Sequence, residues 1–544
     1  MSRDRVPPVG TSVSAADRLP GGRDSHQAGN GRGTAVRRRE LLTLTAMCLG
    51  VMMTFLLVTA TISALSAIQD DLHVGPGALI WIPSAYTLVV ASLVLSASTL
   101  GNLLGRKRMF CVGVVIMIAG GVLAATADTT AMVIVAQLVS GVGGALILPN
   151  SLAVLGASFA DPRRRTEVIT VWAASSGIGL AVGPLLAGVL LDRFSWHAVF
   201  VSNPVLGVIT LLVAVPFAAE SLAPEGRLDV TGALLGTVTI ASVVYALIQG
   251  GQDGYTAGPV IAAWFAAAVG AVVFVAVELR VAAPMLDVRL FASRSFSAVM
   301  VIAAVSLFGF TGVAVLVVMF YNNVQQLSAL DTSWRMLPLF GVYVVSAFLT
   351  GRVIRRTGFK APLTVGLLLG ALAVLGLTTV AADTPYHRVW PLFALFGAAC
   401  GMVISPSTAA ALVSVAPERA GMVSGAVNTA RQVGAVMGTA LLGSLFTGRV
   451  TADLPHQLAA HGVPAAARAP VEQAIASGTT STTAPPDAVR AAIEDAFTSG
   501  VHAGLVVVAA VFFAAAVLAL TSVHNRPHQN GTQMSTPTTT PATS

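Results

Sequence analysis

The sequence is short of charge and of cysteine, and its long apolar runs contain almost no acid. Asp, Glu, Lys and Arg make up only 10% of the 544 residues, whereas a soluble domain carries about 25%. With 55% apolar residues, this shortage excludes an ordinary soluble enzyme. It also excludes disorder for the bulk of the chain. A polytopic membrane protein remains.

The three cysteines, Cys48, Cys111 and Cys400, all fall inside apolar runs. They therefore provide neither a disulfide framework nor a zinc site. The polar stretches carry no Ser/His/Asp set, phosphate-binding loop or GxGxxG segment. We accordingly expect no enzyme activity, no cofactor and no metal.

Long apolar runs recur along the whole chain. A helix needs about 20 apolar residues to cross about 30 Å of hydrocarbon. Fourteen runs are candidate spans: 41–68, 79–104, 109–127, 130–158, 166–191, 198–218, 230–249, 257–278, 296–322, 333–354, 361–381, 389–415, 421–447 and 499–521. The first is too long for a signal-peptide core and lacks a cleavage site, so we expect it to remain as a membrane helix. The sequence predicts an all-α polytopic membrane protein.

The basic residues are distributed unevenly between the two sides of this topology. With the N-terminus inside, the inner segments hold 24 of the 31 Lys and Arg, and the outer segments hold six. Cytoplasmic loops carry such an excess, so we expect both termini in the cytoplasm. The same location argues against nucleic acid as the partner of the net charge of +7. The preference for Arg over Lys is typical of a GC-rich bacterium, which makes the plasma membrane the expected location.

Three polar segments interrupt or flank the spans. Residues 1–40 and 522–544 are expected to be disordered cytoplasmic tails. Residues 448–498 form the one large loop, on the outer side, with short amphipathic helices expected over 471–477 and 487–498. The loop is either a surface cap or a binding domain.

A stripe of small residues marks the run 166–191. Ser176, Gly179 and Gly183 follow one another at helical steps of three and four, with Pro184 and Gly188 beside the stripe. Small residues allow two helix backbones to approach closely, and neighbouring helices can satisfy the carbonyl that Pro frees. Plain helix packing and a role in conformational change both explain such a stripe.

The run Gly179-x-x-x-Gly183-Pro184-x-x-x-Gly188 resembles the fifth-helix motif G-x-x-x-G-P-x-x-G-G of the fourteen-helix drug:proton antiporters in the major facilitator superfamily. Other segments between residues 41 and 521 resemble the same branch: Ala64-Leu65-Ser66-Ala67-Ile68, Trp81 with Tyr86, Gly105-Arg106-Lys107-Arg108, Gly141-x-Gly143-x-Ala145-x-x-x-Pro149, Trp196-x-x-x-Phe200-x-x-Asn203 and Asn428-x-x-Arg431-Gln432-x-Gly434. The resemblance implies a six-helix bundle over 41–218, two extra helices within 219–278, a second bundle over 279–521, and alternating access to a central cavity.

The chain departs from the family pattern where that pattern carries charge. In the motif G-x-L-A-D-R-x-G-R-R after the second helix, Ser98 replaces the first Gly, Asn102 replaces the Asp and Leu103 replaces the next Arg. The resemblance makes Asn102, Gly105, Arg106 and Arg108 the inner-face gate. We expect that gate to be weaker, because an amide carries no charge.

Proton coupling also lacks its usual carrier. The first-helix Asp of the family is Leu57 here, and the fourth-helix Arg is Gln137. No Asp or Glu falls in the interior of a predicted span; Asp192 and Glu278 lie at ends. Protonation of a buried carboxylate is the usual way to couple transport to protons. We therefore expect weak dependence on protons.

Candidate cavity residues combine soft, aromatic and polar side chains, which suit an amphipathic organic molecule. They are Met52, Phe55, Thr59, Tyr86, Gln137, Asn150, Ser176, Asn428 and Arg431. Met52, Phe55 and Thr59 belong to one stripe of the first helix. The alternative for this stripe is that its hydroxyls bond to carbonyls of their own helix and the face only packs against a neighbouring helix. For Tyr86, Gln137 and Asn150 the alternative is a hydrogen bond between helices.

Arg431 is the one formal charge expected deep in a span, about 15 Å from the inner end of its helix. Either it faces the cavity and contacts an acidic or strongly polar part of the substrate, or it snorkels to the inner headgroups or bonds to helix carbonyls of the opposing bundle.

These observations favour a monomeric secondary exporter of hydrophobic or amphipathic compounds, such as an antibiotic, drug or natural product. Its partners would be the small-molecule substrate, the lipid bilayer and protons. The alternative is an uncoupled facilitator or a transporter-derived sensor, because Leu57, Asn102 and Gln137 replace charged residues.

Overall fold

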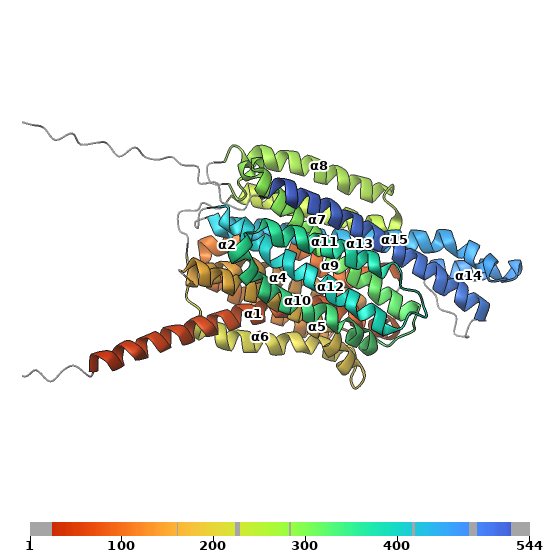
Figure 1. Cartoon of the computed structure of the whole chain (residues 1–544), viewed down its shortest axis with the longest axis horizontal. Coiled ribbons are helices and arrows are strands. Elements are labelled where there is room, and N and C mark those ends of the chain that lie inside the picture. Colours follow the sequence, from red (N-terminus) through yellow and green to blue (C-terminus); the bar gives the residue numbers. More distant parts are fainter. Residues whose placement is uncertain are drawn as a thin grey trace, which may run out of the picture.

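Long α-helices make up nearly all of the computed structural model (Figure 1). It describes residues 24–74, 76–159, 161–222, 229–281, 284–415, 419–477 and 487–523. Within these ranges fourteen helices are long and apolar enough to cross a membrane. A bilayer offers backbone groups no water, so a helix that satisfies its own backbone is the expected form of each run. The predicted fourteen-span, all-α fold class is confirmed.

The helices fall into a first set of six, a pair, and a second set. The first six are α1 (Asp24–Leu72), α2 (Pro76–Leu104), α3 (Arg106–Ala125), α4 (Thr130–Ser158), α5 (Pro162–Leu191) and α6 (His197–Phe217). The pair is α7 (Val230–Asp253) and α8 (Gly258–Glu278). After the 3-10 helix η1 (Val288–Ala292) come α9 (Arg294–Asn323), α10 (Ala329–Thr357), α11 (Lys360–Leu377), α12 (Tyr386–Val413), α13 (Ala420–Ala460), α14 (Ala465–Ser477) and α15 (Asp487–Ser522).

The two sets of spans pack in the same pattern. In the first, α1 contacts α5 and α6, α3 contacts α4 and α6, and α2 contacts α4. In the second, α9 contacts α13 and α15, α11 contacts α12 and α15, and α10 contacts α12. Each half has its own apolar core, around Phe110 and Phe200 in the first and around Phe393 and Phe512 in the second. The halves are thus two six-helix bundles of one repeated design.

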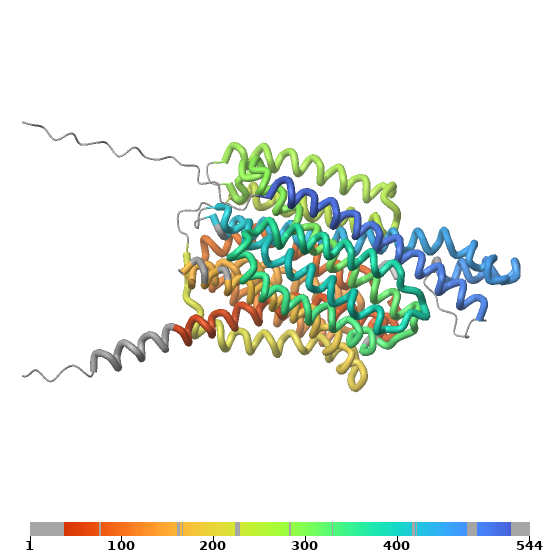
Figure 2. Tube along the Cα trace, viewed as in Figure 1, coloured from red at the N-terminus to blue at the C-terminus, as the bar shows by residue number. Residues whose placement is uncertain are grey.

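The halves meet along two seams. Helix α5 packs on α10, and α2 packs on α13. Helix α7 lies against both α2 and α13, with α8 outside it, so the pair runs along one side of the molecule (Figure 2). Side chains of α8 such as Phe265 and Val272 remain 71% and 72% exposed, as expected for a helix facing lipid.

One end of the helices gathers the basic residues, and we call it the basic end. Arg164 pairs with Glu40 at 2.9 Å, and Arg355 pairs with Glu167 at 2.8 Å. Arg419 pairs with Asp287 at 2.7 Å. These pairs tie the starts of α1, α5 and α13 to their neighbours at that end. Helix α14, with the adjoining ends of α13 and α15, extends beyond the opposite end (Figure 1).

Two predicted polar segments contain more helix than expected. Helix α1 begins at Asp24, inside the tail 1–40 predicted to be disordered; residues 1–23, and residues 524–544 of the second tail, lie outside the described residues. The expected helices over 471–477 and 487–498 lie within α14 and α15, and α13 continues to Ala460, so helix covers most of the loop 448–498 that the structure describes. The cause is that a formed helix adds residues cheaply, so good helix formers extend it past the apolar run.

Candidate functional site

A small cavity lies between the two bundles at the middle of the molecule. It is lined by Phe55 from α1, Trp172, Ser176 and Leu180 from α5, Leu307 and Phe310 from α9, Tyr343 from α10, Ile404 from α12, and Asn428, Arg431 and Gln432 from α13. Its volume of about 20 Å³ is room for roughly one water. A site for a drug-sized molecule needs about 300–1,000 Å³, so this is a closed form that must open to admit a substrate.

Four of the eleven residues that line the cavity are aromatic. Phe310 and Tyr343 pack with ring centroids 5.4 Å apart. The Tyr343 hydroxyl donates to the carbonyl oxygen of Ala173 at 3.1 Å, which joins the second bundle to the first. Trp172 donates from Nε1 to Ser151 Oγ at 3.0 Å. The cavity therefore offers flat apolar faces, because the polar atoms of these rings are already bonded within the protein.

Arg431 provides the charge in this apolar wall. The residue is only 7% exposed. Its guanidinium donates to the carbonyl oxygen of Ile404 and, at 3.4 Å, to Ser407 Oγ. Its Nε has no hydrogen-bond partner among the described residues, and none of the ion pairs in that part of the chain includes it. A charge near the middle of a membrane costs about 2.5–3.5 kcal/mol on insertion scales, and an anion would offset part of that cost.

The carbonyl that Arg431 contacts belongs to α12, in its own bundle. The expectation of a bond to the opposing bundle is corrected accordingly. The reason is that α12 and α13 are neighbours, and a buried guanidinium bonds to a carbonyl within its reach.

Four of the nine predicted cavity residues line this cavity: Phe55, Ser176, Asn428 and Arg431. Ser176 and Asn428 also bond to backbone carbonyls of their own helices, at 2.6 and 2.9 Å. The other five residues do not line it. These four residues, from the three helices α1, α5 and α13 of the two bundles, thus converge at one place, as alternating access requires.

Met52 and Thr59 face α5 instead of the cavity. A Cβ at Gly179 would lie 2.4 Å from the Met52 carbonyl oxygen, and a Cβ at Gly183 would lie 2.0 Å from Thr59 Oγ1. Thr59 also bonds weakly to its own helix, at 3.4 Å to the Phe55 carbonyl oxygen. Met52 and Thr59 therefore belong to the packing contact between α1 and α5, which is the alternative that the sequence left open.

Tyr86, Gln137 and Asn150 are buried inside the first bundle, at 2%, 1% and 1% exposure. Tyr86 donates to the Thr54 carbonyl oxygen at 3.2 Å, and Gln137 Nε2 donates to Thr61 Oγ1 at 3.0 Å. Asn150 Nδ2 donates to the Ala97 carbonyl oxygen at 3.2 Å. Their placement in the cavity is corrected, because a polar group in a dry interior must find a partner and nearby helices supply it.

The sequence reasoning missed Trp172, Phe310 and Tyr343. Each lies in a span rich in apolar residues, and neither spacing nor a motif separates a cavity aromatic from a core aromatic. Only the juxtaposition of α5, α9 and α10 identifies them.

The predicted conformational residues of α5 lie on its contacts with both bundles. Gly179 and Gly183 face α1, and Pro184 stands inside the helix. Gly188 faces the other bundle, since a Cβ there would lie 3.1 Å from Leu330 of α10. One helix thus touches its own bundle and the opposing one through glycines.

The predicted gate residues lie at the basic end, where α2 meets α13. Asn102 Oδ1 accepts from Arg106 Nε at 3.0 Å and from Nη2 at 2.9 Å. A Cβ at Gly421, on α13, would lie 2.7 Å from the same Asn102 oxygen. Ser98 Oγ donates to the Gly421 carbonyl oxygen at 2.5 Å. Across this seam the described residues form the Ser98–Gly421 hydrogen bond and no ion pair.

Gly105 and Arg108 shape the turn between α2 and α3. Gly105 has a φ of 106°, a conformation that favours glycine. The backbone N–H groups of Lys107 and Arg108 each donate to the Glu220 carboxylate at 3.0 Å, and a carboxylate is stabilised at a helix N-terminus. Arg108 therefore contributes its backbone, while its side chain is exposed.

Comparison with known proteins finds relatives that match most of this chain. The family model described as Major Facilitator Superfamily matches residues 47–439. The chain is 32% identical over 427 residues to the multidrug resistance protein Stp of Mycobacterium tuberculosis, covering 77% of this chain and 79% of that one. It is 31% identical to the methylenomycin A resistance protein of Streptomyces coelicolor, covering 76% and 86%. The crystal structure of the human organic anion transporter MFSD10 has the same fold, with a TM-score of 0.61 and 14% identity over 88% of this chain and 99% of that one.

Proposed function

The chain belongs to the major facilitator superfamily, and from that membership we propose that it exports drugs, antibiotics or similar amphipathic compounds by alternating access. The relatives include a multidrug resistance protein and an antibiotic resistance protein, each matched over three quarters or more of this chain. No observation favours an uncoupled facilitator or a sensor. The family is one of transporters, in accord with the expectation that the chain is not an enzyme.

The observation that carries the proposal is the central cavity. Two matching bundles enclose it, and its wall combines the aromatic rings of Phe55, Trp172 and Phe310 with the guanidinium of Arg431. Flat apolar faces bind ring systems by burial and stacking, and a desolvated cation favours a negative group. Compounds that join an aromatic body to an acidic group fit this wall best.

The orientation follows from charge. The basic end faces the cytoplasm in this proposal, because cytoplasmic segments carry the excess of Lys and Arg. Both termini then lie inside the cell, α14 lies outside, and the membrane is the bacterial plasma membrane. We further propose that the transporter acts as a monomer, since one chain supplies both bundles, and that protons are its coupling partner.

Dye accumulation tests the proposal directly. Cells that lack their own exporters should accumulate less of an amphipathic fluorescent dye when they express the protein. Trp172→Ala should weaken this effect, because it removes a large apolar face from the cavity. Val272→Ala is the matched control, since Val272 on α8 is 72% exposed. Equal accumulation with and without well-expressed protein, over a panel of neutral, cationic and anionic dyes, would reject export.

A further inference from the structure

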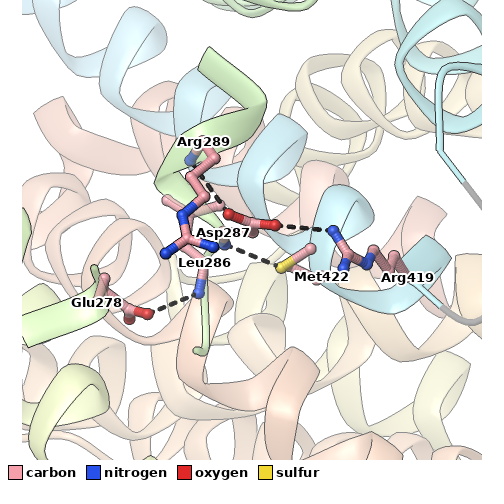
Figure 3. A network of polar contacts seen from close by, with 6 residues as sticks. All are labelled: Glu278, Leu286, Asp287, Arg289, Arg419 and Met422. Atoms are coloured by element: carbon pink, nitrogen blue, oxygen red, sulfur yellow. Dashed lines mark hydrogen bonds and ion pairs between the residues drawn. The ribbon is translucent and has the colours of Figure 1, made fainter. Parts of the chain in front are cut away.

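Two buried carboxylates meet where α7 begins and α8 ends, well away from the central cavity. Asp229 is 8% exposed and Glu278 is 3% exposed. One oxygen of each is occupied. Asp229 Oδ1 accepts from the Gly232 N–H at 2.8 Å. Glu278 Oε2 accepts from the Leu286 N–H at 3.4 Å (Figure 3). The second oxygens, Asp229 Oδ2 and Glu278 Oε1, are buried and have no hydrogen-bond partner in the described part of the chain.

These two unpartnered oxygens converge on one point. A Cβ at Gly232 would lie 2.4 Å from Asp229 Oδ2 and 2.6 Å from Glu278 Oε1. The oxygens are therefore no farther apart than the sum of those distances. Glycine leaves open the space that any side chain at this position would fill.

In the part of the chain that the structure describes, no cation pairs with either carboxylate. Asp287 is the other acid nearby, and its partner is Arg419 of α13, at 2.7 Å. Arg280 and Arg289, in the segment that leaves α8, are exposed, where water and salt screen their charges. On the α2 side the neighbour is Ser96, which bonds to Thr237 Oγ1 at 3.2 Å. Among the described residues, neither Asp229 nor Glu278 forms an ion pair.

Two adjacent carboxylates without a cation cannot both remain charged in a dry site, so one of them takes a proton. The helix ends decide which. Asp229 caps the N-terminus of α7, where the helix dipole stabilises a negative charge. Glu278 is the last residue of α8, where the dipole opposes one. The proton therefore resides on Glu278.

We propose that Asp229 and Glu278 bind one proton between them, with the Glu278 Oε1–H donating to Asp229 Oδ2, and that this proton keeps the α7–α8 pair attached to the basic end of α13. A metal cation fits less well. No group of three or more potential ligands is found in the described residues, and hard cations take about six or more oxygens.

The attachment runs through a short chain of contacts. Glu278 accepts a hydrogen bond from the Leu286 N–H. The N–H of the next residue, Asp287, donates to Met422 Sδ at 3.2 Å. The Asp287 carboxylate accepts from the Arg419 guanidinium (Figure 3). Loss of the proton leaves two buried negative charges in contact, and these contacts must then loosen. The start of α13 also closes on α2 at Gly421, so the proton is linked to closure of the basic end.

Infrared spectroscopy of the purified full-length protein tests the proposal without a transport measurement. At neutral pH the wild type should show the band of a protonated carboxyl group, and the band should disappear as the pH is raised. Glu278→Gln should abolish it. Asp229→Asn should shift it, because the acceptor of the hydrogen bond changes. Asp253→Asn, an exposed carboxylate at the other end of α7, should leave the band unchanged.

If a variant fails to fold, wild-type protein containing carboxyl-labelled glutamate can be used instead. A band that moves with this label belongs to a glutamate, and Glu278 is the only buried Glu among the described residues. Absence of the band at neutral pH, or a band unmoved by glutamate labelling, would overturn the proposal. Loss of the band on adding sodium at constant pH would show that the pair binds a metal cation instead.

Discussion

At the scale of single residues, the wall of the cavity differs from an ordinary membrane interior in one respect. Among the residues that the structure describes, Arg431 is buried without an acidic partner and has an unpartnered Nε. Its bond to the Ile404 carbonyl satisfies part of its hydrogen-bonding capacity but does not neutralise its charge. A structural arginine needs only carbonyls, whereas a substrate-binding arginine gains from an anion, and substitution separates the two roles.

We predict that Arg431→Gln abolishes transport of anionic compounds and spares neutral ones. The lost charged hydrogen bond is worth about 1.5–3 kcal/mol, or roughly a tenfold loss or more. Arg431→Lys should retain part of the activity, because the charge stays while the planar fork is lost. Uptake into inside-out vesicles measures both, with the exposed Arg352→Gln as the control. Equal loss for both classes of compound, or loss of the folded protein, would favour a structural role.

At the scale of helices, the contact between α1 and α5 depends on glycine. A Cβ at Gly183 would lie 2.8 Å from the Leu56 carbonyl oxygen, and a backbone atom cannot rotate away. By contrast, nothing lies within 4 Å of a Cβ at Gly443 of α13. The two glycines look alike in sequence but differ in what surrounds them.

We therefore expect Gly183→Leu to separate α1 from α5 or to misfold the bundle. Overpacking of this kind costs typically about 1–3 kcal/mol. Transport should be lost even where the protein reaches the membrane, and the melting temperature should fall. Gly443→Leu, the matched control, should change both much less. Normal transport by a well-expressed Gly183→Leu variant would mean that the helices do not touch closely there.

At the contact between α2 and α13 we predict a substitution that raises stability. Asn102→Asp should convert its two hydrogen bonds to Arg106 into a bidentate ion pair. Because both residues are only half-buried, the gain should be about 0.2–1 kcal/mol. Thermal unfolding of the variant measures it, and combining it with Arg106→Gln should cancel the gain. A lower melting temperature for Asn102→Asp alone would show that burying the added charge costs more than the ion pair gains.

At the scale of the whole molecule, two bundles of the same design close on each other through the seams α5–α10 and α2–α13. The α7–α8 pair lies against the second seam, so it is placed to affect opening at the basic end. Opening the cavity requires these seams to separate in turn, which is a motion of whole bundles.

Fusions to a reporter that works only outside the cytoplasm test the orientation. A fusion after Ser544 should be inactive, and one inserted within residues 475–485 should be active. The 24-to-6 distribution of basic residues motivates this expectation. The reverse pattern would contradict the fourteen-span topology.

Coupling is the second whole-molecule prediction. With Leu57 in place of the family's first-helix Asp, efflux should depend on an imposed pH step less steeply than in relatives that keep that carboxylate. Vesicles at fixed membrane voltage provide the measurement. A steep dependence would point to a proton carrier outside the first-helix position, with Glu278 among the candidates. Asp71, which accepts from Trp196 Nε1 at 2.8 Å, and His502, bonded to the Val380 carbonyl at 2.8 Å, would then be substituted first.

The sequence by itself determined the spans, their number and the close contact at Gly183, because hydropathy and small-residue spacing are properties of each helix alone. Only the tertiary structure decided which polar groups reach the cavity: Arg431 does, whereas Gln137 is bonded to Thr61 inside one bundle. It also decided that Asp229 and Glu278, 49 positions apart in the sequence, share one buried site. Such pairings depend on how distant helices are rotated against each other, and no local pattern encodes that rotation.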